Sequence, residues 1–391
     1  MTNDTYIKDH NLYIHDTSIM KILYMLFHGF DEASGISKKI MAQIAGLQKA
    51  NHSVYLCHYE RTEDDHRCRM IDNEVVEDYG TGLWAAAKSR CNFDSVVRFV
   101  DKHAIDVAYI RSFHNANPGV IHFFKKLRRL GIKVALEIPT YPYDTEYNRM
   151  PISWKMVLCV DRIFRYRLAA QCNCIVTFSD AEKIFGQRTV CISNGVDFDE
   201  TPLAQHLPST DGSIHLLAVA EIHYWHGFDR AVHGLGLYVQ KYPDAPIVFD
   251  IVGPNFNHDA DVIKKVISQY PNLEKHVFLH GPKHGEELTA FFNKADICIA
   301  SLARHRSGIT KIKTLKNREY AVRGLPFVYS EIDEDFEKMP YVMKAPADET
   351  PLDIEALLRF KSHCTIDPKS IRESIRHLDW KVQMKRVLDE L

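Results

Sequence analysis

Residues 301–329, SLARHRSGITKIKTLKNREYAVRGLPFVY, place a strand end, a basic loop and a helix start in one stretch of chain. The apolar run ADICIA (295–300) precedes it, and the expected helix stops at Gly324 before a second apolar run, LPFVY. Several cations come before the first acid, Glu319: Arg304, Arg306, Lys311, Lys313, Lys316 and Arg318. Unpaired backbone N–H groups and the helix dipole favour negative charge at such a helix start. The stretch predicts an anion site; the alternative is a solvated basic helix face.

Apolar runs typical of buried strands recur along the chain and alternate with amphipathic helices. They are KILYMLF (21–27), HSVYLCHY (52–59), IDVAYIRSF (105–113), IKVALEIP (132–139), NCIVTFS (173–179), IHLLAVAEI (214–222), PIVFDIVGPN (246–255) and HVFLHG (276–281). Continuous apolar strands between helices predict parallel sheets that are covered on both faces. Two such sets predict an α/β protein with two Rossmann-like, doubly wound domains facing each other.

Bulk properties narrow the class of protein. A chain of 391 residues suits two domains, and a formal net charge of −2 argues against a dedicated nucleic-acid binder. Nine cysteines without a framework spacing indicate a reducing compartment. No apolar run is long enough to span a bilayer, and no signal pattern opens the chain, so we expect a cytoplasmic protein. Residues 1–18 are expected to form a tail.

Several motifs together resemble a known family. They are ISNGVD (192–197), HLLAVAEIHYWHGFDRAVHGL (215–235), FDIVGP (249–254), VFLHGPKHGEEL (277–288), LKNREYAVRGLPFV (315–328) and LDW (378–380). Their order is similar to that of retaining glycosyltransferases of the GT-B fold, in the family 4 (group 1) type that builds bacterial surface polysaccharides. The resemblance implies an acceptor-side domain over 1–195, a donor domain over 196–370 and a C-terminal helix, 371–391, folding back on the first domain.

The resemblance also implies a donor site in the second domain that binds a UDP- or GDP-hexose without a metal or other cofactor. Protein cations would stabilise the leaving diphosphate, and Lys316 is the best candidate for this catalytic role. Glu319 would hydrogen-bond the ribose hydroxyls. The remaining donor-site candidates are Lys313, Arg304, His226 and Leu315, together with Gly35 from the first domain.

This chain departs from the family pattern at three positions. Lys311 stands where most members have the first of two glutamates, and Glu221 and His226 stand where most have an arginine and a lysine. Both usual phosphate cations are therefore replaced. His226 could still donate to a phosphate, or it could be a packing residue beside Trp225.

The first domain is expected to hold the acceptor at the carboxyl ends of its strands. In the loop DEASGISKK (31–39), Gly35 lets backbone approach a ligand and Ser37 is expected to cap the helix. Two further loops supply the other candidates. The predicted catalytic residues there are Arg111 and Glu137, and the predicted acceptor-binding residues are His114, Tyr141 and Tyr143.

Two basic, aromatic segments raise the question of a membrane surface. FFKKLRRL (123–130) favours an ordinary packed helix, whereas WKMVLCVDRIFRYRLAA (154–170) suits packing and an anionic membrane interface equally. The run Asp333–Glu334–Asp335 is expected to be an exposed acidic turn rather than a metal site.

The sequence thus predicts a retaining, metal-independent hexosyltransferase acting on a glycan or lipid-linked saccharide. It is expected in the cytoplasm, either free or peripheral on the inner face of the cell membrane. A catalytically silent GT-B subunit that binds glycan or a partner transferase is the first alternative, favoured by the replaced positions. A GT-B sugar-nucleotide epimerase is the second.

Overall fold

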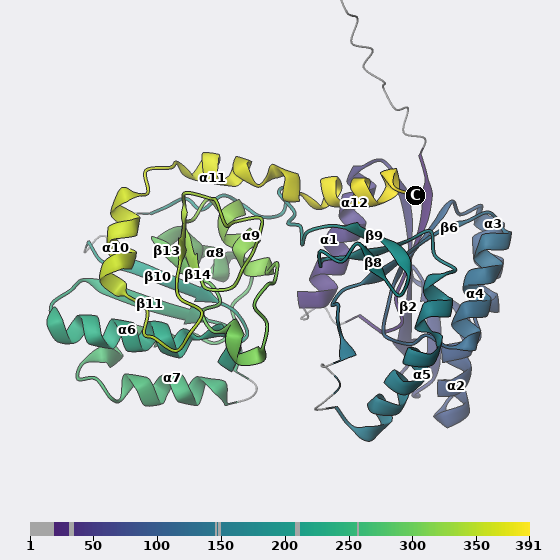
Figure 1. Ribbon diagram of the computed structural model, residues 1–391, viewed down its shortest axis with the longest axis horizontal. Coiled ribbons are helices and arrows are strands. Elements are labelled where there is room, and N and C mark those ends of the chain that lie inside the picture. The colour runs from purple at the N-terminus through teal and green to yellow at the C-terminus, as the bar shows by residue number, and fades with distance from the viewer. Residues whose placement is uncertain (1–18, 31–34, 145–146, 148–149, 208–211, 256–257) are drawn as a thin grey trace, which may run out of the picture.

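The computed structural model describes residues 19–30, 35–144, 147, 150–207, 212–255 and 258–391. It contains two α/β domains side by side, and the chain crosses from the first to the second after residue 191 (Figure 1). This arrangement confirms the expected fold class.

The first domain is built on a nine-stranded sheet, with strand order β4-β3-β2-β1-β5-β6-β7-β9-β8. The strands are β1 (Lys21–Met25), β2 (Ser53–Arg61), β3 (Arg67–Ile71), β4 (Glu74–Asp78), β5 (Val107–Arg111), β6 (Lys133–Ile138), β7 (Cys174–Thr177), β8 (Lys183–Ile184) and β9 (Gln187–Cys191). The apolar runs predicted a wholly parallel sheet, and the structure corrects this prediction. β2, β3 and β4 form an antiparallel extension, and β8 pairs antiparallel with β9.

Alternate side chains of these strands pack on helices on opposite faces. α1 (Gly35–Lys49) and the C-terminal helix α12 (Trp380–Asp389) cover one face, where Tyr24 and Tyr109 are buried. α3 (Asp94–His103), α4 (Pro118–Arg129) and α5 (Ile152–Ala169) cover the other, and α2 (Gly82–Cys91) packs beside α4. The run 123–130 is therefore a packed helix, as favoured, since Phe123, Phe124 and Leu127 are all buried.

The second domain has six parallel strands in the order β12-β11-β10-β13-β14-β15. They are β10 (Ile214–Val219), β11 (Ile247–Val252), β12 (Val277–Leu279), β13 (Ile297–Ile299), β14 (Phe327–Tyr329) and β15 (Val342–Lys344). Its helices are α6 (Phe228–Lys241), α7 (Asp259–Ile267), α8 (Gly285–Lys294), α9 (Leu315–Val322), α10 (Ile354–His363) and α11 (Pro368–Ser374). The chain enters the sheet at β10 and continues outward on both sides, so a topological switch point lies between β10 and β13, where open α/β sheets bind ligands.

The carboxyl ends of the two sheets meet across the domain boundary. Lys311, in the loop before α9, forms an ion pair with Asp180, which follows β7. The chain then returns through α11 to place α12 against α1, seen in yellow beside purple in Figure 1. Among the described residues, no helix is both long and apolar enough to cross a membrane.

Candidate functional site

A cluster of ionisable side chains lies at the switch point of the second domain. His226 ends a short 3₁₀ helix (Tyr224–His226) after β10, and Arg304 begins another (Arg304–Ser307) after β13. Lys316 lies in the first turn of α9, and Glu331 follows β14. Each side chain thus comes from the carboxyl end of a strand or the start of a helix, where ligands of such sheets bind.

Lys316 and His226 are in direct contact, with Lys316 Nζ 2.9 Å from His226 Nε2. Burial and the nearby Lys316 and Arg304 charges hold the pKa of His226 well below its usual value, so its ring is neutral. A lysine ammonium can only donate, so in the charged form of Lys316 the Nε2 atom accepts. Burial, reinforced by Arg304, lowers the pKa of Lys316 to about 7. At neutral pH Lys316 is therefore only partly protonated. A bound anion would raise its pKa and make it fully charged.

Glu331 is the acid of this cluster. It is 2% exposed, and neither carboxylate oxygen has a hydrogen-bond partner among the described residues. Burial raises the pKa of Glu331 to about 7, although Arg304 and Lys316 lie near enough to oppose the shift. Neither forms an ion pair with it within the described chain, although buried polar groups are normally satisfied. An unpartnered buried carboxylate beside two cations is the signature of a ligand site.

Sequence reasoning missed Glu331. The available signal was its place directly after the apolar run LPFVY and Ser330, at the carboxyl end of a central strand.

The predicted donor residues on and before α9 lie next to this cluster. Glu319 lies three residues beyond Lys316, with its side chain one-third exposed and its Oε1 3.3 Å from Arg323. Leu315 is the exposed first residue of α9. The ammonium of Lys313 lies 4.0 Å from Cys191 Sγ, and the Lys313 carbonyl accepts a hydrogen bond from Asn194. Their contacts with a donor remain predictions.

The basic run as a whole does not form one anion site, which corrects the expectation from the sequence. Arg306 binds Asp229 and Glu349, and Lys311 binds Asp180 and Glu334. Of the six cations, Arg304 and Lys316 are the two that the structure brings together with His226 and Glu331.

Arg318 is fully buried and forms ion pairs with Asp333 and Asp335. It also donates to the carbonyl oxygen of Asn194 and to the hydroxyl of Ser193, which lie in the crossing between the domains. The prediction of an exposed acidic turn is therefore wrong for Asp333, which is fully buried. Its ion pair with Arg318 compensates the burial of its charge. Arg318 joins the two domains through its side-chain contacts.

The replaced family positions have their own partners. Glu221 Oε1 lies 3.1 Å from His223 Nε2, and Lys311 is held between two carboxylates. The His226 ring stacks on Phe228 with centroids 5.3 Å apart. His226 therefore packs at the helix start beside Trp225 and Phe228, as one interpretation of the sequence had it. Donation from His226 to a phosphate remains a prediction.

Arg111 and Glu137 lie side by side on β5 and β6, but they are not displayed to a substrate. Glu137 is fully buried, and its carboxylate accepts hydrogen bonds from Arg111, Tyr109 and Gln43. Burial raises the pKa of Glu137, but the charges of Arg111 and Lys39 and the hydrogen bonds from Tyr109 and Gln43 together hold it below its usual value. The sequence placed these residues at the surface of the acceptor site, whereas the structure places them in a satisfied network within the domain.

The predicted acceptor residues His114, Tyr141 and Tyr143 also pack internally. The His114 ring stacks on Tyr143 at 3.7 Å, and burial lowers the pKa of His114 to about 4. Tyr143 donates to Asp161 at 2.6 Å, and Tyr141 meets Phe185 edge-on. Tyr143 is buried, so its ring face is not open to a sugar.

Gly35 begins α1 instead of preceding it, and a Cβ at this position would meet nothing within 4 Å. Ser37 lies within the first turn and is buried, so it is not the helix cap that the sequence predicted. Residues 31–34 of this predicted loop lie outside the described residues. A role for Gly35 at the donor phosphates remains a prediction.

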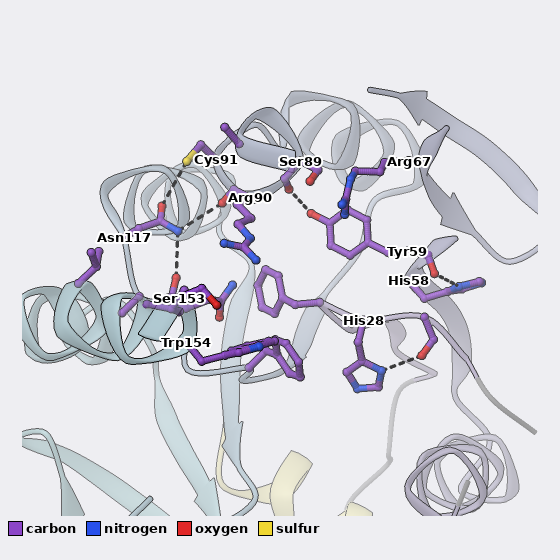
Figure 2. A pocket seen from close by; sticks show the side chains of 18 of the residues that line it. His28, His58, Tyr59, Arg67, Ser89, Arg90, Cys91, Asn117, Ser153 and Trp154 are labelled. Atoms are coloured by element: carbon purple, nitrogen blue, oxygen red, sulfur yellow. Dashed lines mark hydrogen bonds between the residues drawn. The ribbon is translucent and has the colours of Figure 1, made fainter. Parts of the chain in front are cut away.

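A cavity of about 1150 Å³ occupies the carboxyl edge of the first sheet, beside its own switch point between β1 and β5 (Figure 2). It is bounded by residues that follow β1 and β5, by the end of β2, by the start of β3, and by α2 and α5. Its walls combine aromatic rings with cations, among them Phe27, Tyr59, Trp154, Arg67 and Arg90. The sequence predicted an acceptor at this edge of the sheet, and that role stays a prediction. It missed the wall residues, because they come from separate segments of the chain.

Comparison with known proteins identifies the architecture. No family model and no curated protein matches the sequence. Among solved structures, sucrose-phosphate synthase of Thermosynechococcus elongatus is 15% identical with a TM-score of 0.62, covering 95% of this chain and 98% of that one.

Two other solved structures have TM-scores of 0.57 and are 13% identical. They are a glycosyltransferase of Rickettsia africae, with 95% of this chain and 97% of that one covered, and Anabaena HepE in complex with UDP, with 95% and 99% covered. The similarity extends over both domains of this chain. The chain therefore has the GT-B fold that its sequence motifs predicted.

Proposed function

We propose that this protein is a glycosyltransferase that transfers a hexose from a nucleotide sugar to a saccharide acceptor with retention of configuration and without a metal ion. The observation that carries the proposal is the cluster of Lys316, His226, Arg304 and Glu331 at the switch point of the second domain. The fold supports it, since solved proteins of this fold include HepE in complex with UDP-glucose.

The chemistry needs a site for growing negative charge. The bond between the anomeric carbon and the diphosphate oxygen breaks while the acceptor oxygen forms the new bond on the same face. The acceptor proton passes to the leaving phosphate oxygen. Lys316 and Arg304 would stabilise the charge on the diphosphate more strongly in the transition state than in the ground state. Their burial strengthens this effect, because charges interact more strongly away from water.

Glu331 would bind the other end of the donor. A carboxylate accepts hydrogen bonds, and hexose hydroxyls are the donors nearest to a diphosphate in a nucleotide sugar. Glu319, one helical turn after Lys316, remains the candidate for the ribose hydroxyls.

The acceptor would occupy the cavity of the first domain. Aromatic faces suit sugar rings, and Arg67 and Arg90 suit an acceptor that carries negative charge. The proposed setting is surface-polysaccharide assembly on the cytoplasmic side, where the nine unpaired cysteines would stay reduced.

The first experiment is thermal stabilisation by UDP, GDP, ADP, CMP and dTDP in the presence and absence of EDTA. A nucleotide at a hundredfold its dissociation constant stabilises the folded state by about 2.7 kcal/mol. We expect one nucleotide to stabilise wild type, EDTA to leave the effect unchanged, and Lys316→Ala to reduce it by about half or more. Full stabilisation of the Lys316→Ala variant, or loss of the wild-type effect in EDTA, would refute the site as proposed.

A catalytically silent GT-B subunit is the second candidate, favoured by one observation. Lys311 stands where most members of the similar family have the first glutamate. It pairs with Asp180 of the first domain and with Glu334 of the second, so it links the two domains. Nucleotide binding without release of hexose from any nucleotide sugar, with or without saccharide acceptors, would select this candidate.

A further inference from the structure

The surface beside the acceptor cavity carries a stripe of exposed apolar side chains along α5. Its members are Ile152, Met156, Val160, Ile163 and Tyr166, with exposed fractions between 42% and 77%. Their spacing places them on one face of the helix, while Leu158, Asp161 and Leu168 on the opposite face are buried. The helix therefore has two apolar faces, of which the domain core covers one.

The other helix at the cavity, α2, extends this surface. Leu83 and Trp84 in its first turn are 89% and 88% exposed. Large apolar side chains exposed this fully, on two helices that border one cavity, mark an interaction site. α2 and α5 both line the cavity, with Arg90 from α2 on one wall and Trp154 from α5 on another (Figure 2).

Cations flank the apolar side chains. α5 carries Lys155, Arg162, Arg165 and Arg167, and its one acid, Asp161, is buried. α2 adds Lys88 and Arg90 and no acid. Lys155, Arg167 and Arg90 form no ion pair with any other described residue, so their charge is available to a partner. An apolar stripe with basic flanks on an amphipathic helix is the pattern that lies in an anionic lipid interface.

Charge also argues against a second copy of the chain. A two-fold interface places the same face on both partners, which would set these basic flanks against each other. Anionic lipid headgroups instead complement them, while Trp84 and the α5 stripe would enter the acyl boundary.

We infer that the α2–α5 face docks this protein on an anionic lipid bilayer and that the acceptor is a saccharide carried by a lipid of that bilayer. Met156 and Val160 belong to the α5 stripe and also line the cavity, so the apolar surface continues into it. A lipid-anchored acceptor could thus reach the cavity without leaving the membrane plane. The acceptor class rests on the proposed transferase function, whereas the docking does not.

The test is sedimentation of the full chain with phosphatidylcholine vesicles, with and without phosphatidylglycerol, at low and high salt. We expect wild type to bind the anionic vesicles at low salt and to be largely released at high salt. Leu83→Ser/Trp84→Ser and Ile152→Ser/Ile163→Ser should each bind at least tenfold more weakly. The affinity of Lys155→Glu/Arg167→Glu for anionic vesicles should fall about fivefold or more for each cation replaced. None of these residues lines the cavity.

The matched control is Leu237→Ser/Val262→Ser, which replaces two half-exposed apolar residues on α6 and α7 of the second domain. It should bind as wild type does. Absence of binding to anionic vesicles at low salt would overturn the inference, as would equal loss in the control. A wild-type dimer that the α5 variant converts to a monomer would assign the face to a second copy instead.

Nucleotide stabilisation of the same variants separates this inference from the proposed function. The face variants should keep the wild-type nucleotide effect because their changes lie outside the donor cluster. Vesicle binding without any nucleotide effect would refute the transferase and leave the docking standing.

Discussion

The ammonium of Lys316 lies 2.9 Å from Nε2 of a neutral, buried His226, at the switch point of the sheet of the second domain. The imidazole orients the lysine without neutralising it, so the charge stays available to an anion. This contact connects two residues 90 positions apart in the sequence. It joins the turn after β10 to the first turn of α9.

Nucleotide affinity should fall as the pH rises above 7, because the pKa of Lys316 is about 7 in the free protein. A bound diphosphate raises that pKa, so binding takes up a proton above pH 7 and weakens by up to about tenfold per unit. Titration calorimetry between pH 7.5 and 9.5 measures the slope of log affinity against pH. The phosphate, with a pKa of about 6, is already ionised in this range and does not contribute to the slope.

Two variants identify the residue responsible for this slope. Lys316→Arg should keep affinity at high pH and lose most of the slope, since arginine does not deprotonate. Lys316→Ala should bind about 10- to 100-fold more weakly at pH 7. An unchanged slope in Lys316→Arg would show that another group takes up the proton.

Glu331→Gln should separate sugar recognition from nucleotide recognition. Replacing the carboxylate removes a strong acceptor for hexose hydroxyls but leaves the cations in place. We expect nucleotide affinity to be kept and the additional affinity of the nucleotide sugar to fall about tenfold or more. The control is Glu334→Gln, because Glu334 pairs with Lys311 outside the cluster.

The same variant has a stability signature in the free protein. The pKa of Glu331 is raised to about 7 in the folded state from its ordinary value of 4.5, so wild type loses stability as the pH rises from 4.5 through 7. Glu331→Gln lacks this loss. Its thermal midpoint relative to wild type should therefore increase between pH 4.5 and 7.5, and a constant difference would contradict the unpartnered carboxylate.

The fold was predictable because its signals are local and repeated. Apolar runs such as 132–139 and 214–222 became central parallel strands, since a strand buried on both faces needs continuous apolar sequence. The hairpin extension at Arg67–Asp78 was missed because its sequence, RCRMIDNEVVED, mixes charged and apolar residues at a sheet edge.

The site was predictable only in part, because the sequence gives neither burial nor pairing. Lys316 and Arg304 follow strand ends and do lie together. Arg318 looked equivalent to Lys316, but two carboxylates from the apparent acidic turn neutralise it. Glu137 lies at a strand end as predicted, but it points into the domain, and a single sequence does not show which way that strand faces.

Arg318→Ala should destabilise the protein by about 3–5 kcal/mol, because it leaves Asp333 buried without its partner. Urea unfolding followed by circular dichroism measures the change. Arg306→Ala is the control: it removes a more exposed pair with Asp229 and Glu349 and should cost about 1 kcal/mol or less.

In a double-mutant cycle, Arg318→Met/Asp333→Leu should cost clearly less than the sum of its single changes, since no buried charge is left unpaired.

Gly46→Ala tests the return of the C-terminal helix onto the first domain. In the middle of a helix this change alone would stabilise by about 1 kcal/mol, because alanine has the higher helix propensity. Here a Cβ would lie 2.7 Å from the backbone carbon of Trp380 and 2.9 Å from the backbone nitrogen of Lys381, where α12 crosses α1. Backbone atoms cannot move aside as a flexible side chain does, so we expect a net destabilisation of about 1–3 kcal/mol by urea unfolding. Gly35→Ala, at the other end of the same helix, should show no such loss, since no described residue lies within 4 Å of its Cβ. A stabilised Gly46→Ala variant would mean that α12 does not pack on α1, and the domains would then be joined without it.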